Sequence, residues 1–181
     1  MPDQNLHAVI RTYLERANEQ AKSHTTEHFI ELDSVQFLRE RLAPGYCLEL
    51  IEYAYQDGGK RQDSVLLTQD AQGRLNVLSG GAQHVDEVPI IFNRANRQDT
   101  PFLRLGWQTW PNGPFCARGA VIEKGFEVTR VRLIDANGSH LESDVQNHLV
   151  LFLSEQVLTP PFTIEFYNRA GEIIGIEVTR Q

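Results

Sequence analysis

The chain has 181 residues, of which 41% are hydrophobic and 23% charged, and this composition is typical of a folded globular protein. Its formal net charge of -7 opposes nonspecific attraction to nucleic acid and to anionic lipid, and its longest apolar runs are far shorter than the roughly 20 residues that cross a bilayer. We therefore expect no nucleic-acid partner and no membrane partner.

Two helices are expected near the N-terminus. The first spans residues 6–20, where apolar side chains recur at three- and four-residue spacings. This stripe consists of Leu6, Val9, Ile10, Tyr13, Leu14 and Ala17. The second is the stretch DSVQFLRERL, residues 33–42, in which the initial Asp-Ser pair can cap free amides and a following Pro-Gly pair ends the helix. Its stripe consists of Val35, Leu38 and Leu42.

After Gly45 the pattern changes to short apolar runs separated by turn residues, which is typical of β-strands. The runs YCLELIEYAY, SVLLTQ and RLNVLSGG predict a three-stranded antiparallel meander, whose faces need the two helices as cover. From residue 118 to the end, about six strand candidates and no helical stripe predict an antiparallel β-sandwich with Greek-key connections.

Three turns share one sequence pattern. Each begins with an Asp or Asn, which can accept local backbone amides, and each has a glycine three residues later that can adopt positive φ. The turns begin at Asp70, Asp135 and Asn168. In its number of strands and in the last of these hairpins, the C-terminal region resembles the small immunoglobulin-like modules of many bacterial proteins. The resemblance covers about a third of the chain and implies a fold but not a function.

The predicted fold class is therefore α+β. N-terminal helices cover a small antiparallel sheet, and an immunoglobulin-like antiparallel β-sandwich follows and packs tightly on it. We expect a helix pair with a meander in residues 1–104, a bridging segment in residues 105–117, and the sandwich in residues 118–181.

The N-terminus and the cysteines predict the compartment. A secretory signal peptide needs positive charge near its start, whereas this chain carries Asp3 there, and its apolar positions are periodic. Cys47 and Cys116 are too few for a disulfide scaffold and too far apart for a CxxC metal or redox motif. We expect an acidic, soluble, cytoplasmic protein.

The bridging segment contains both tryptophans and is the first candidate for ligand binding. An exposed tryptophan among Pro and Gly residues can stack on a sugar or anchor a protein partner, whereas a buried one would fill a seam between modules. Both interpretations stay open for Trp107 and Trp110. Arg118 follows closely in the chain and is the third candidate ligand-binding residue.

Cys116 is a candidate nucleophile. It lies close to Arg118 in a turn-rich segment, and a neighbouring cation favours the thiolate form. The alternative is that Cys116 is buried as a small hydrophobic residue.

The stretch HTTEH, residues 24–28, has the H-x-x-E-H pattern and is similar to the motif of inverzincin peptidases. The resemblance implies that His24 and His28 hold a zinc ion and that Glu27 acts as the base. Those enzymes are much longer and take a third ligand from a distant helix, which has no counterpart in this sequence. The alternative is a solvated turn between helices.

The leading functional prediction is a non-catalytic binding or accessory protein without a cofactor, which presents a loop or a sheet edge to a protein partner. The solvent-facing stretches EVTRVRL and GEIIGIEVTR carry charged residues, as guarded edge strands do, and could pair in a homodimer. The alternative is a small hydrolase or thiol enzyme that uses Cys116, or a metal held by His24 and His28.

Overall fold

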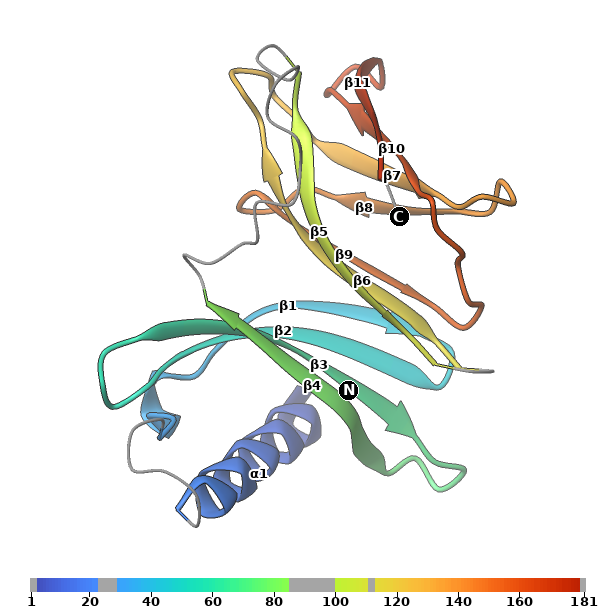
Figure 1. Ribbon diagram of the computed structural model, residues 1–181. Helices are drawn as coiled ribbons and strands as arrows, with labels where there is room; N and C mark the ends of the chain where they lie inside the picture. Colours follow the sequence, from blue (N-terminus) through green and yellow to red (C-terminus); the bar gives the residue numbers. More distant parts are fainter. Residues whose placement is uncertain (1–2, 23–28, 85–99, 111–112, 180–181) are drawn as a thin grey trace. The chain divides into compact units, whose positions relative to one another are not determined.

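The computed structural model describes residues 3–22, 29–84, 100–110 and 113–179 (Figure 1). Within these ranges the chain forms one α-helix, one short 3-10 helix and eleven strands in three antiparallel sheets. In chain order the elements are α1 (Asp3–Ala21), η1 (Leu32–Ser34), β1 (Gln36–Ala43), β2 (Tyr46–Ala54), β3 (Lys60–Gln69), β4 (Leu75–His84), β5 (Phe102–Thr109), β6 (Phe115–Ile122), β7 (Arg130–Ile134), β8 (His140–Asp144), β9 (Leu149–Ser154), β10 (Thr163–Tyr167) and β11 (Ile173–Val178). The chain divides into two compact units, residues 1–89 and residues 90–181.

In the first unit, α1 covers one face of a sheet with the order β1-β2-β3-β4 (Figure 1). The predicted apolar stripe faces this sheet, because Leu6, Ile10 and Leu14 are buried against side chains of β2 and β3. One side of the helix also contacts β1, where the ring of His7 stacks on that of Phe37 with centroids 3.6 Å apart. The first predicted helix is confirmed, and the three strands of the predicted meander are present as β2, β3 and β4.

The prediction of several N-terminal helices is wrong. Residues 33–42 form the end of η1 and most of β1, so the sheet has four strands and one α-helix covers it in the described part of the chain. The Pro44-Gly45 pair connects two antiparallel strands, since Ala43 pairs with Tyr46 on either side of it. Gly45 has a φ of 74°, a value that favours glycine in a tight turn. The apparent helical stripe does not form a buried face either, because Leu38 and Leu42 are exposed.

The second unit contains two antiparallel sheets, with orders β5-β6-β9 and β11-β10-β7-β8. Both sheets contribute to one core, for example Phe115 and Phe152 from the first sheet and Ile164 and Phe166 from the second. This arrangement is that of a β-sandwich. Its strands begin at residue 102, ahead of the predicted start at residue 118, and the predicted bridge 105–117 contains most of β5 and the start of β6.

The three hairpin turns have the predicted chemistry. Their glycines, Gly73, Gly138 and Gly171, have φ between 78° and 85°. In the second turn, Asp135 Oδ1 accepts hydrogen bonds from the backbone N–H groups of Asn137 and Ser139 at 2.8 and 2.9 Å. These bonds satisfy donors within the turn and set the register of each hairpin.

Candidate functional site

The predicted metal ligands His24 and His28, and the predicted base Glu27, lie outside the described residues. The metal-site interpretation of HTTEH therefore stays a prediction.

Trp107 and Arg118, two of the predicted ligand-binding residues, lie on opposite faces of one sheet. Trp107 lies near the end of β5, is 41% exposed, and packs edge-to-face on Phe162 of the sandwich core with ring centroids 5.4 Å apart. Trp107 pairs with Ala117, whose side chain is in the core, so Arg118 projects from the opposite face of the sheet. Trp110 is half-buried after the end of β5 and its carbonyl accepts a hydrogen bond from the Gly113 N–H.

Cys116 is buried in β6, and burial raises the pKa of its thiol to about 11 although the charge of Arg118 opposes the shift. A nucleophilic cysteine needs the reverse, a lowered pKa and access to substrate. The geometry therefore favours the interpretation of Cys116 as a small hydrophobic residue.

One group of potential metal ligands was not predicted. Glu40, Cys47 and Glu49 place one donor atom each within 4.8 Å of one another. Glu40 and Glu49 face each other directly across β1 and β2, where two like charges are unfavourable. A thiolate with two carboxylates suits zinc. The pKa of Cys47 is raised to about 12 by burial and by these two glutamates, so a metal would have to displace the thiol proton. This group alone does not assign a function.

Helix α1 is held firmly along one flank. Arg11 Nη1 donates a 2.9 Å hydrogen bond to the carbonyl of Leu32. Further along the helix, Asn18 Nδ2 donates to the Ile30 carbonyl at 2.9 Å, and Asn18 Oδ1 accepts from the Ile30 N–H at 2.8 Å. These contacts tie the helix to the segment that precedes β1.

The other flank of α1 borders an open groove of about 740 Å³ beside β4. The helix contributes five residues to its lining, Ala8, Val9, Thr12, Tyr13 and Arg16, and β4 contributes its first six, Leu75, Asn76, Val77, Leu78, Ser79 and Gly80. We call this feature the α1–β4 groove. Because β4 is the outermost strand and pairs with β3 alone among the described strands, the groove follows an edge of the sheet.

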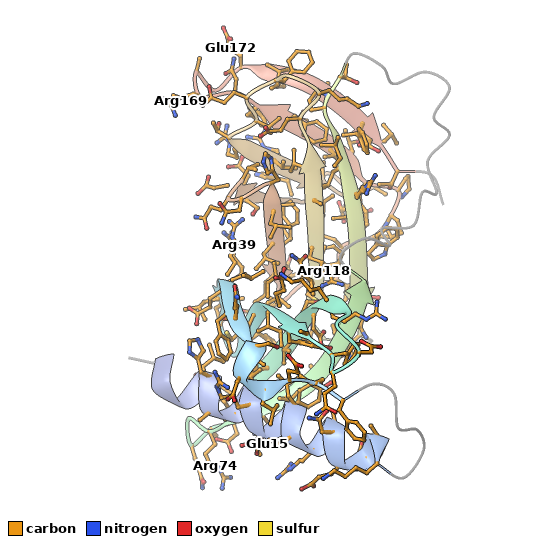
Figure 2. All side chains as sticks on the ribbon, turned by 90° about the vertical axis from the view of Figure 1, so that its left-hand side faces the viewer. Glu15, Arg39, Arg74, Arg118, Arg169 and Glu172 are labelled. Carbon is orange, nitrogen blue, oxygen red and sulfur yellow. The ribbon has the colours of Figure 1, made fainter. Side chains whose placement is uncertain are left out.

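The groove has two chemically different ends. At one end Leu75 lies close to Leu6 and to the β3–β4 turn, which contains Arg74 (Figure 2). At the other end the hydroxyl of Tyr13 lies over Gly80, where any side chain would collide with it. Burial and the charge of Asp63 raise the pKa of Tyr13, so this hydroxyl stays protonated at neutral pH. The end near Gly80 therefore has a neutral hydroxyl group, whereas the end near Leu75 combines an apolar side chain with the polar Asn76.

The second unit offers a different surface, on β11. Ile173, Ile176 and Val178 project from the outer face of this edge strand and are 49%, 61% and 52% exposed. Glu177 points inward instead and is buried, and its Oε2 accepts a 3.0 Å hydrogen bond from the N–H of Leu103. Figure 2 labels Arg169 and Glu172 in the turn that leads into this strand. Three aliphatic side chains in a row on an edge strand form a candidate contact surface.

Beside this row the outer face of the sheet is polar and internally paired. Glu142 Oε1 lies 2.6 Å from Arg132 Nη2 and Glu142 Oε2 lies 3.1 Å from Arg130 Nη1, while Arg132 also reaches Glu165 at 3.4 Å. Both guanidinium groups lie over the ring of Tyr167, at 4.4 and 5.1 Å from its centroid. The hydrogen bond from Arg132 lowers the pKa of Glu142. β7, which carries both arginines, pairs on both sides and is not the edge strand suggested by EVTRVRL.

Comparison of the chain with protein-family models, with curated proteins and with solved structures finds no match. Among the described residues, α1 lacks the apolar character that a membrane-crossing helix requires, and no other helix is long enough.

Proposed function

We propose that this protein is a non-catalytic binding protein that takes an extended segment of a protein partner into the α1–β4 groove. The observation that carries the proposal is the position of the groove along β4, an edge strand of the sheet. An edge strand has backbone N–H and C=O groups that can pair with an added strand, and a neighbouring helix can contact the side chains of that strand.

The dimensions of the groove support a short peptide as the ligand. Six consecutive residues of β4 line it, and an extended peptide beside them would span about 20 Å. Exposed Leu78 and the flank of Val9 provide apolar contacts, while Asn76 and Ser79 provide polar ones. Backbone pairing would supply affinity, and these side chains would supply selectivity.

The experiment is a selection of peptides on the folded full chain, followed by binding measurements on a blocked variant. Random heptapeptides are displayed on phage, and the most enriched peptide is synthesised with a fluorescent label. Thr12 is exposed and lies in the middle of the groove, so Thr12→Trp fills the groove without disturbing the core. We expect Thr12→Trp to weaken binding at least tenfold. Glu19→Trp, an exposed position of α1 outside the groove, is the matched control and should bind like the parent.

Two results would count against the proposal. If no heptapeptide is enriched over a display vector without insert, the groove does not select extended segments. If Thr12→Trp and Glu19→Trp both bind the selected peptide like the parent, the peptide binds elsewhere. Slower hydrogen exchange of residues 75–80 in the complex would support strand addition, because the added strand protects edge amides.

A second copy of the chain is the partner that the exposed row on β11 favours. A row of aliphatic side chains can pack against the same row of a second copy, as an isologous contact requires, and the charged groups beside this row are paired within the sheet. In this second candidate function the protein acts as a homodimer. Sedimentation velocity from micromolar to near-millimolar concentration tests it, and a monomer throughout that range would exclude it.

The proposed compartment is the cytoplasm. Cys47 and Cys116 are both free and buried, which suits a reducing environment. The buried thiol of Cys116 with its raised pKa gives no support for a thiol enzyme, so no catalytic function is proposed for it.

A further inference from the structure

The charge of the α1–β4 groove indicates which peptides it would take. Among its eleven lining residues, Arg16 carries the charge. The guanidinium group is exposed on α1, and it makes no ion pair or hydrogen bond with the part of the chain that the structure describes. The chain as a whole has a net charge of -7, whereas the lining residues of the groove carry this one positive charge.

The position of Arg16 along the groove follows from the contacts of the helix. Leu6 lies near Leu75, and Tyr13 lies over Gly80, so α1 and β4 run in the same direction beside the groove. Arg16 is three residues beyond Tyr13, which corresponds to about 4.5 Å along a helix axis. Arg16 therefore lies at the Gly80 end, where its long side chain can reach the end of a bound strand.

The groups at this end suit a carboxylate. An arginine binds a carboxylate with two parallel charge-assisted hydrogen bonds, which are stronger than neutral ones. Tyr13 carries a hydroxyl in the same region, and this hydroxyl occupies the space that a side chain at Gly80 would take. At the end near Leu75 the neighbouring cation is Arg74, whose guanidinium group is already paired with Asp70 at 2.7 Å.

On the basis of the proposed function, we infer that the partner segment carries a carboxylate that binds Arg16 at the Gly80 end of the α1–β4 groove. The carboxylate belongs to an Asp or Glu side chain or to the C-terminus of the partner. Both sources present the same planar anion to the guanidinium group, and the experiment separates them.

The test uses two synthetic heptapeptide libraries, one with a free C-terminal carboxylate and one with an amidated C-terminus. Each is passed over the immobilised full chain, and the retained peptides are sequenced. An acidic side chain as the source enriches Asp or Glu at one position in both libraries. A C-terminal carboxylate as the source gives retention from the free library alone.

The role of Arg16 is tested with the retained peptides and two variants of equal charge. Arg16→Gln should weaken binding about tenfold, as expected for the loss of a charge-assisted pair. Lys22→Gln removes the same charge from an exposed residue that lines a different hollow, and its affinity should match the parent. Replacing the peptide Glu by Gln, or amidating its C-terminus, should weaken binding to the parent but leave binding to Arg16→Gln nearly unchanged.

The inference and the proposed function fail in different ways. Suppose that neutral, amidated peptides are retained, that Thr12→Trp abolishes their binding, and that Arg16→Gln does not. This result would overturn the carboxylate inference and leave the groove as a peptide site. Failure of both libraries to yield any retained peptide would overturn the proposed function as well. Equal weakening by Arg16→Gln and Lys22→Gln would indicate attraction by net charge alone and would also overturn the inference.

Discussion

Replacement of Asn18 by alanine tests how α1 is held beside the groove. The side chain makes two hydrogen bonds with the backbone of Ile30, one through each end of its amide, at 2.9 and 2.8 Å. Each such bond stabilises a folded protein by about 1 kcal/mol. Ile30 is buried, so in the variant its N–H and its carbonyl lose their hydrogen-bond partners where water reaches them poorly. This raises the loss of stability by about another 1 kcal/mol.

Alanine partly offsets this loss because it favours helix over asparagine by about 0.6 kcal/mol. We therefore expect Asn18→Ala to lower the free energy of unfolding of the first unit by about 2 kcal/mol. With a urea dependence of about 2 kcal/mol per molar, the midpoint would fall by about 1 M.

Circular dichroism at 222 nm is a suitable assay, since α1 is the α-helix of the described chain. Tryptophan fluorescence reports separately on the second unit, which contains Trp107 and Trp110. Glu19→Ala, at the exposed neighbouring position, is the control and should stay within about 0.5 kcal/mol of the parent. An unchanged helix midpoint in Asn18→Ala would refute the view that Asn18 holds the helix.

Three further predictions concern the second unit. Ile176→Lys places a charge in the exposed row of β11, so it should shift any self-association seen by sedimentation toward monomer without lowering the thermal midpoint; dimerisation equal to that of the parent would exclude this row as the contact. Iodoacetamide at pH 7 should modify Cys116 much more slowly than free cysteine, because burial raises the thiol pKa to about 11; modification at the rate of free cysteine would show an accessible thiolate. Burial opposes ionisation of Asp135, but hydrogen bonds from the backbone N–H groups of Thr159, Asn137 and Ser139 outweigh it and lower the pKa of this carboxyl. The carboxylate therefore stabilises the fold at pH values above its unfolded pKa, and this stabilisation is lost as the pH falls through the lower folded pKa. Asp135→Asn should therefore flatten the acid limb of the stability profile, and an unaltered limb would contradict this reasoning.

The first helix and the hairpin turns were predictable because their signals are local. A helical stripe from Leu6 to Ala17 contains its own periodicity, and an Asp or Asn three residues before a glycine specifies its own turn. Residues 33–42 contain a weaker stripe whose members also suit a strand. These residues form a strand because they pair with β2 through the Pro44-Gly45 turn. The partner strand lies outside the segment, so the sequence of the segment alone does not reveal the pairing.

The candidate groove was not predictable for a related reason. Its helical wall shares Val9 and Tyr13 with the margin of the apolar stripe, but its other members, Ala8, Thr12 and Arg16, give no motif. Its other wall matters because β4 is an edge strand, which depends on the order of strands in the finished sheet. The cluster of Glu40, Cys47 and Glu49 was missed because Glu40 was assigned to a helix, although a two-residue hairpin at Pro44-Gly45 sets Glu40 opposite Glu49.

The hydrogen bond from Leu103 to Glu177 joins residues 74 positions apart and has a consequence for synthesis on the ribosome. The first strand of the sandwich obtains this partner from the last strand, so the second unit cannot be completed until nearly all of the sequence has emerged. The first unit has its helix and all four strands within residues 3–84 and can fold while the remainder is still being translated. We therefore expect the two units to fold one after the other during translation, with the sandwich completed once β11 has emerged.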